Sequence, residues 1–88
     1  MEDTLQLPMI HLNGTGADSL FKQYNEAYDA VCKAVDAFDK IDCNARDYYV
    51  IDSEAHERAR KHRSQQKVKL MNVQFYLEHH LVHIEKYK

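Results

Sequence analysis

The residues best suited to bind a ligand lie in two short turns. One of them is residues 43–54, CNARDYYVIDSE, which contains Arg46, Tyr48 and Tyr49. A guanidinium can bind a phosphate or a carboxylate through two parallel hydrogen bonds, and a tyrosine ring can stack on a base. A structural interpretation is equally open, because Arg46 could cap helix carbonyls while one of the tyrosines closes the end of a core.

The other turn is residues 11–19, HLNGTGADS. Its candidate ligand-binding residues are Asn13, Gly14, Thr15 and Gly16. A glycine-containing loop that leads into a helix presents free amide groups at the positive end of the helix dipole, where anions bind. The lysine of a P-loop is absent, so the turn is not that motif. A plain turn followed by a helix cap would explain the same residues.

A basic segment, residues 56–69, carries six lysines and arginines against one glutamate. The members that we predict as a secondary anion surface are Arg58, Arg60, Lys61 and Arg63. Residues 18–42 have the opposite bias, with six acidic residues against three basic ones. We therefore favour an arrangement in which the basic segment faces the acidic one, within a chain or between copies. A surface that binds phosphates is the alternative.

Metal binding and catalysis find little support. His79 and His83 are four residues apart on one helical face, a spacing that suits a metal ion, and His11 could approach them. No third ligand is evident and the HExxH motif is absent, so we predict no metal and no cofactor. Cys32 and Cys43 form no CxxC pair, and no nucleophile is paired with a base in a recognisable motif, so we predict that the protein is not an enzyme.

Helices must position these residues, and the 88-residue sequence predicts one all-α domain. We expect an antiparallel two-helix hairpin with a short extended N-terminal arm. Its parts are the arm and glycine-rich loop at 1–17, a first helix at 19–41, a turn at 42–52 and a second helix at 53–87. Asp18 or Ser19 would cap the first helix, Asn44 would end it in the left-handed conformation, and Asp52 or Ser53 would cap the second helix.

The first helix has a wide apolar face. A spacing that alternates between four and three residues is typical of a heptad seam. This spacing connects Leu20, Tyr24, Ala27, Val31, Ala34, Phe38 and Ile41. A second column, Phe21, Tyr28 and Val35, runs beside it, so the face is wider than one partner helix requires, and we predict self-association into a helical oligomer. The seam expected on the second helix is Leu70, Val73, Leu77, Leu81 and Ile84. The second helix is also the longer one, so it should overhang or bend.

Hydropathy, net charge and cysteine content limit the compartments and partners that we expect for the protein. There is no apolar run of the roughly 18 residues that a membrane span needs, and the N-terminus lacks the basic region of a secretory signal. The net charge of −2 makes a nucleic-acid partner the third-ranked hypothesis. Two cysteines too far apart along a helix to form a disulfide fit a reducing cytosol.

The two turns also carry a resemblance to a group of proteins. The N-G-T motif at 13–15 and the R-D-Y-Y motif at 46–49 resemble small, mostly uncharacterised proteins of bacteriophages and prophages, over most of the chain from about Met9 onward. The chain departs from that pattern at Ala45 and Val50, where a glycine before the arginine and a proline soon after the tyrosines are expected, and this affects the tightness of the turn. The resemblance implies phage origin and action in an infected bacterium, where small phage proteins often disarm host defences by binding.

In a hairpin the two turns fall at opposite ends of the first helix, about 35–40 Å apart by helix rise. We therefore predict a composite site at a subunit junction, formed by residues 13–16 of one copy with Arg46 and a tyrosine of another. The expected function is a non-enzymatic phage protein that binds and sequesters an anionic small ligand, with a nucleotide immune signal as the leading example, in the cytoplasm of the infected host. The alternative is a protein–protein inhibitor or assembly factor that acts on a host or phage protein through its helical faces.

Overall fold

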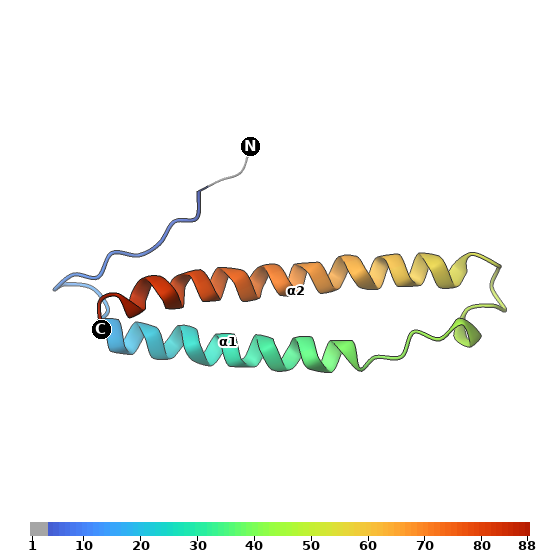
Figure 1. Ribbon diagram of the computed structural model, residues 1–88, viewed down its shortest axis with the longest axis horizontal. Coiled ribbons are helices and arrows are strands. Elements are labelled where there is room, and N and C mark those ends of the chain that lie inside the picture. The colour runs from blue at the N-terminus through green and yellow to red at the C-terminus, as the bar shows by residue number, and fades with distance from the viewer. Residues whose placement is uncertain (1–3) are drawn as a thin grey trace.

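The computed structural model describes residues 4–88, and two α-helices that run antiparallel account for most of them (Figure 1). The first, α1, spans Ala17–Asp39 and the second, α2, spans Ala55–Glu85. A single 3₁₀ turn, η1, occupies Ala45–Asp47 in the connection between them. The prediction of an all-α hairpin is confirmed. Neither helix has a stretch long and apolar enough to pass through a lipid bilayer.

The start of α1 differs from the predicted cap. Gly16, rather than Asp18 or Ser19, precedes the first helical residue, with extended backbone angles of φ −63° and ψ 153°. Its carbonyl accepts a hydrogen bond from the Leu20 amide at 2.9 Å. No side chain caps this end of α1. A glycine is common at this position, because the N-cap residue takes extended angles that glycine adopts freely.

The end of α1 corrects a second prediction. Asn44 has φ −89° and ψ 138°, which is extended rather than left-handed, and no residue from 4 to 88 has a positive φ. The Lys40 amide donates to the Ala37 carbonyl at 3.2 Å, the Ile41 amide donates to the Phe38 carbonyl at 3.1 Å, and α2 adds further bonds. The Arg63 guanidinium donates to the Phe38 carbonyl at 3.3 Å and to the Asp39 carbonyl at 3.1 Å. These local bonds and the cap from the neighbouring helix together make a left-handed cap unnecessary.

The connecting segment lies beside the part of α2 that extends beyond the end of α1. After α1 ends, residues 40–54 continue beside the first turns of α2 (Figure 1). Nε2 of His56 donates to the Cys43 carbonyl at 2.9 Å, and the Tyr48 ring lies 5.9 Å from the His56 ring. The expected overhang is therefore lined by the connecting segment, and α2 continues unbroken from Ala55 to Glu85.

The core is small. The buried hydrophobic residues among those described are Ala55, Leu77 and Ile84, and His80 is the buried polar residue. Helical hairpins of this size bury little apolar surface, and short chains have correspondingly thin cores. Most of the large apolar side chains of α2 remain at least partly accessible to solvent.

The contact face of α1 keeps part of the predicted seam and is rotated toward the second column. Leu20, Tyr24, Val31 and Phe38 of the seam are half-buried, and Ala27, Ala34 and Ile41 are exposed. The second column, Phe21, Tyr28 and Val35, is also half-buried. The second helix therefore covers the side of α1 that carries the column Tyr24, Val31 and Phe38 together with the column Phe21, Tyr28 and Val35. The column that we expected to need another copy therefore packs in the interior of the hairpin.

The face of α2 that packs against α1 also differs in part from the seam predicted from the sequence. Val73 is 45% exposed, whereas Gln74 is half-buried and its amide lies 3.4 Å from the Cys32 sulfur.

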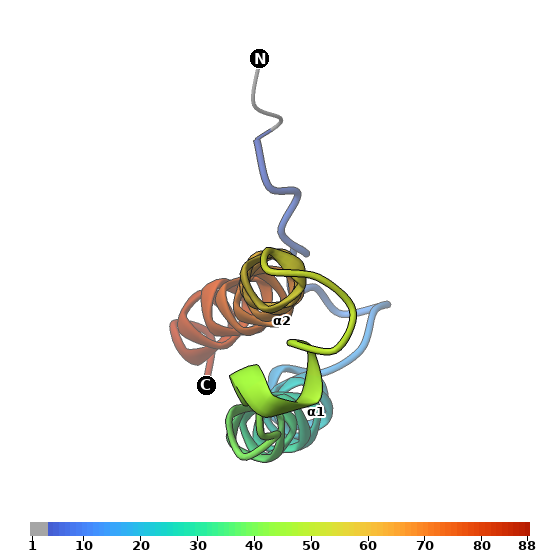
Figure 2. The ribbon, with the colours of Figure 1, turned by 90° about the vertical axis from the view of Figure 1, so that its right-hand side faces the viewer.

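The N-terminal segment from residue 4 to Gly16 has no helix or strand. Its first part lies on the side of α2 away from α1, and the chain then passes beside the two helices to reach the start of α1 (Figure 2). The Pro8 carbonyl accepts a hydrogen bond from Nε2 of His83 at 2.6 Å.

Candidate functional site

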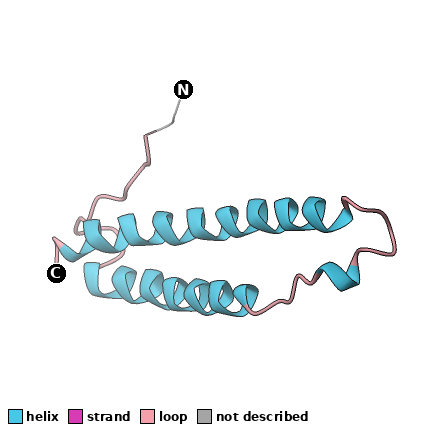
Figure 3. Cartoon of the chain, turned by 45° about the vertical axis from the view of Figure 1, so that its right-hand side comes forward, coloured by secondary structure: helices cyan, strands magenta, loops and turns pink. Residues whose placement is uncertain are grey.

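The two predicted ligand-binding turns lie at opposite ends of the hairpin (Figure 3). Residues 13–16 precede α1, close to the end of α2, and Arg46, Tyr48 and Tyr49 lie in the connection at the far end. One chain therefore does not bring them together. A site that used both turns would need a second copy.

The turn at 13–16 is held by His11. The Gly14 amide donates to the His11 carbonyl at 3.1 Å, and the Asn13 amide lies 3.3 Å from Nδ1 of His11. A Cβ at Gly14 would approach the His11 ring to 3.1 Å, so a larger residue there would displace the imidazole. A Cβ at Gly16 would meet nothing within 4 Å. Neither crowding nor a positive φ requires a glycine at position 16.

The central turn separates its aromatic residues. Tyr48 is half-buried against His56, as expected for a ring that closes the end of the hairpin. Tyr49 is 70% exposed. Arg46 is exposed in η1 and has no ion pair with any residue from 4 to 88. The structural interpretation therefore fits Tyr48, whereas Arg46 and Tyr49 are accessible for recognition.

The basic residues of α2 are largely occupied by the chain itself. Lys67 bonds Asp39 of α1 at 2.6 Å, and Arg63 caps the end of α1. Arg60 pairs with Glu57 one turn away at 3.3 Å. Among these contacts, the Lys67–Asp39 pair is the one that joins a basic residue of α2 to a carboxylate of α1.

Arg58 has a further role at the start of α2. Its guanidinium bonds the Asp52 carboxylate at 2.8 Å, and the Glu54 amide donates to the same carboxylate at 2.8 Å. The Arg58 bond, followed by the Glu54 amide, lowers the pKa of Asp52, and the same carboxylate raises the pKa of Arg58. Asp52 thus orders the segment that leads into α2, although Glu54 occupies the N-cap position itself.

Two shallow pockets lie beside these cations. The first, of about 350 Å³, is lined by Asp39, Cys43, His56, Arg60, Arg63, Ser64 and Lys67. The second, of about 470 Å³, is lined by Glu57, Arg60, Lys61, Ser64 and Gln65. An anion in either pocket would compete with carboxylates already in place, which makes them weaker candidates than the two turns.

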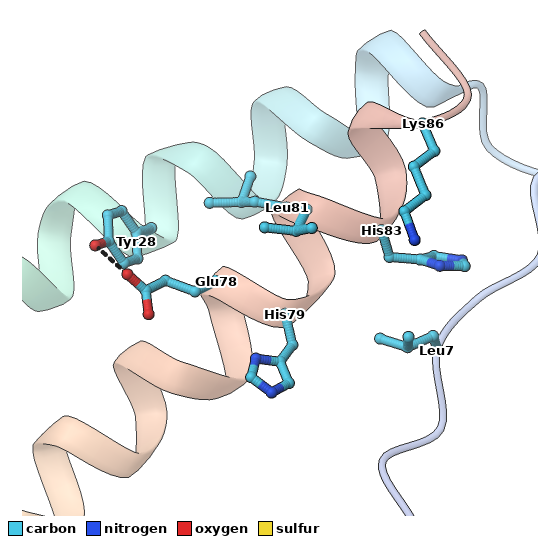
Figure 4. A pocket seen from close by; sticks show the side chains of 8 residues that line it. Leu7, Tyr28, Glu78, His79, Leu81, His83 and Lys86 are labelled. Atoms are coloured by element: carbon cyan, nitrogen blue, oxygen red, sulfur yellow. Dashed lines mark hydrogen bonds between the residues drawn. The ribbon is translucent and has the colours of Figure 1, made fainter.

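A larger groove of about 730 Å³ lies between the N-terminal segment and the last turns of α2 (Figure 4). Its lining residues are Leu7, Tyr28, Glu78, His79, Leu81, Val82, His83 and Lys86. The Tyr28 hydroxyl donates to the Glu78 carboxylate at 2.9 Å. This bond is the main reason that the pKa of Tyr28 rises to about 12.

The groove contains the histidine pair noted in the sequence. His79 and His83 both line it, but Nε2 of His83 is bound to the Pro8 carbonyl, and His11 lies over Gly14 instead. Within residues 4–88 no group of three or more histidine, cysteine, aspartate or glutamate side chains could hold a metal ion.

The most buried polar side chain escaped the sequence analysis. His80 is 2% exposed and stacks on Tyr24 of α1, with ring centroids 4.6 Å apart and an interplanar angle of 13°. The Tyr76 ring also packs on His80, with ring centroids 4.4 Å apart. Nδ1 of His80 donates to the Tyr76 carbonyl at 2.9 Å. Burial raises the pKa of Tyr24. The spacing of three and four from Leu77 through His80 to Ile84 placed this histidine on the inward face.

Comparison with protein-family models, with curated proteins and with solved structures finds no match. The resemblance to phage proteins therefore rests on the sequence motifs alone.

Proposed function

We propose that this chain is a non-enzymatic protein that binds and sequesters an anionic small ligand, with nucleotide signals of host defence as the leading class. The observation that supports the proposal is the contrast among the arginines. Arg58, Arg60 and Arg63 are engaged with carboxylates or carbonyls of the chain, whereas Arg46 is exposed without an ion pair among residues 4–88. An arginine left free beside an exposed tyrosine suits recognition of a phosphate and a base.

The turn at 13–16 supplies the second half of the proposed site. Its open glycine and the uncapped amides at the start of α1 suit an anion. Since the two halves lie at opposite ends of one chain, the site requires self-association. The phage resemblance suggests the setting, which is the cytoplasm of an infected bacterium.

Calorimetry with a panel of cyclic mono-, di- and trinucleotides tests the proposal. We expect binding by the native chain and a loss of affinity of about tenfold or more in Arg46→Ala, because a charge-assisted hydrogen bond contributes about 1.5–3 kcal/mol. Arg60→Ala is the matched control, since Arg60 is an exposed arginine already paired within its own helix. No heat of binding across the whole panel would refute the proposal.

A second candidate function is inhibition or assembly of another protein through the helical faces. The observation that favours it is the exposed apolar surface of α2, which includes Phe75 and Val82 at 53% and 64% exposure. Affinity purification from infected cells would check this alternative. If the chain recovers only further copies of itself, the alternative fails.

A further inference from the structure

The groove between the N-terminal segment and the last turns of α2 takes no part in the proposed nucleotide site. Its lining comes from Leu7, from Tyr28 of α1 and from residues 78–86 of α2, all within one chain. Its volume is about 730 Å³. Pockets that bind small molecules usually have volumes of about 300–1,000 Å³. The groove therefore has the size of a binding site for a small ligand and needs no second copy to complete it.

Alkyl and aromatic side chains form much of the lining. Leu7, Leu81 and Tyr28 are half-buried, and Val82 is 64% exposed. Figure 4 shows the Leu7 side chain directed from the N-terminal segment toward α2. A ligand held between Leu7 and Val82 would remove apolar surface of both residues from water, which is favourable. The lining therefore suits a ligand with an apolar body.

The charges around the groove indicate the sign of the polar group on the ligand. The Glu78 carboxylate accepts the Tyr28 hydroxyl at 2.9 Å, and the Glu85 carboxylate pairs with Lys88 at 3.8 Å. Lys86 also lines the groove, is exposed, and has no ion pair with any residue from 4 to 88. Within the described chain, the charge that the lining leaves without a partner is therefore a cation, and an anionic group would complement it.

The apolar and cationic parts of the lining lie along one face of α2. Positions 79, 82, 83 and 86 are separated by three and four residues, so their side chains are neighbours on the helix surface. Nε2 of His83 is bound to the Pro8 carbonyl at 2.6 Å, which fixes the N-terminal segment as the second wall. Lys86 follows Val82 by one helical turn. One short molecule can therefore place an acidic group at Lys86 and its apolar body between Leu7 and Val82.

We propose that this groove binds a small amphipathic carboxylate, with the carboxylate at Lys86 and an alkyl body between Leu7 and Val82. A single lysine matches a headgroup with one negative charge. The groove shares no residue with the two recognition turns and lies within one chain. The carboxylate site and the nucleotide site are therefore separate proposals, and either can fail without the other.

Calorimetry with octanoate, octanol and octylammonium tests the role of the charge, because the three probes share one alkyl chain. The native protein should bind octanoate most tightly and octylammonium most weakly. Lys86→Met should lower the affinity for octanoate about fivefold, as expected for an exposed ion pair, and leave that for octanol unchanged. Lys69→Met is the control, because Lys69 is an exposed lysine of α2 outside the lining. No saturable binding of octanoate, octylammonium binding as tight as that of octanoate, or equal losses in the two variants would overturn the proposal.

A second pair of variants tests the apolar wall. Leu7→Asn should weaken octanoate and octanol alike while circular dichroism stays unchanged, because residue 7 lies outside both helices. Leu12→Asn is the control, since Leu12 belongs to the same segment, is 98% exposed and does not line the groove. Octanoate should shift the amide NMR signals of Leu7 and of residues 78–86. Full affinity in Leu7→Asn, or shifts confined to the turns at 13–16 and 46–49, would contradict the assignment of the groove.

Discussion

The two ends of the hairpin differ in what joins the helices. At the end that carries the chain termini, Leu77, His80 and Ile84 are buried and Tyr24 stacks on the imidazole. At the turn end, Ala55 is the one buried hydrophobic residue among those described, and Arg63 and Lys67 reach across to α1. Salt screens exposed ion pairs, whereas apolar burial is not weakened by screening. We therefore expect the end that carries the termini to contribute more stability than the turn end, and the turn end to be the more sensitive to salt.

The largest effect should come from the apolar end. Ile84 is fully buried, so Ile84→Ala should lower the free energy of unfolding by about 2–5 kcal/mol, through lost burial and the cavity left behind. Val50→Ala, at a residue of the connection that is 74% exposed, is the control and should change little. Urea unfolding at one fixed protein concentration measures both, since association would otherwise shift the midpoint. Equal losses in the two variants would contradict the assignment of the core.

Arg63 should have the next largest effect, and it belongs to the turn end. Arg63→Ala removes two hydrogen bonds to the last carbonyls of α1. We expect a loss of about 1–2 kcal/mol, somewhat below the usual value for bonds to a charged group because Arg63 is partly exposed. Arg60→Ala removes only a pair within α2 and should cost less than about 0.5 kcal/mol. If both variants lose the same stability, the cap does not hold the end of α1.

A smaller effect is expected for the ion pair between Lys67 and Asp39. A double-mutant cycle with Lys67→Met and Asp39→Asn should give a coupling of about 0.2–1 kcal/mol, because both side chains are partly exposed. The coupling should shrink as salt is added. A coupling that is independent of salt would show that the two side chains interact through packing rather than charge.

The smallest effect is expected at alkaline pH, from the hydrogen bond between Tyr28 and Glu78. The folded-state pKa of Tyr28 is about 12, against 10.0 without its partners. Because the folded-state value is the higher, the contribution of Tyr28 is fully present below pH 10.0 and is lost as the pH rises through about 12. Tyr28→Phe should therefore lose less stability than the native chain over that interval. Identical pH profiles would show that the bond to Glu78 does not persist in solution.

The sequence predicted the helices well because their signals are local. Periodicity placed both helices, and the structure moves their ends by about two residues, which is the usual uncertainty. The rotation of the contact face could not be predicted, because Ala27 and Phe21 both lie in regular apolar columns. Only the direction of the partner helix decides which column is covered.

The candidate site was accessible to sequence reasoning only in part. Residue types and turn positions pointed to Arg46 and Tyr49, and the structure leaves both exposed. The groove beside Leu7 was not predictable, because it depends on where the N-terminal segment meets α2 through Pro8 and His83. Such a contact between residues far apart in the chain has no local signal.

The cap that Arg63 provides has a further consequence for how the chain acquires its structure. No side chain of α1 closes either of its ends. Gly16 has no side chain, and at the other end the Asp39 carbonyl accepts its hydrogen bond from the Arg63 guanidinium of α2. During synthesis from the N-terminus, the first helix can fray at its end until residue 63 has been made and the chain has doubled back. The Asp39 carbonyl therefore gains its hydrogen bond from Arg63 only when the hairpin has closed.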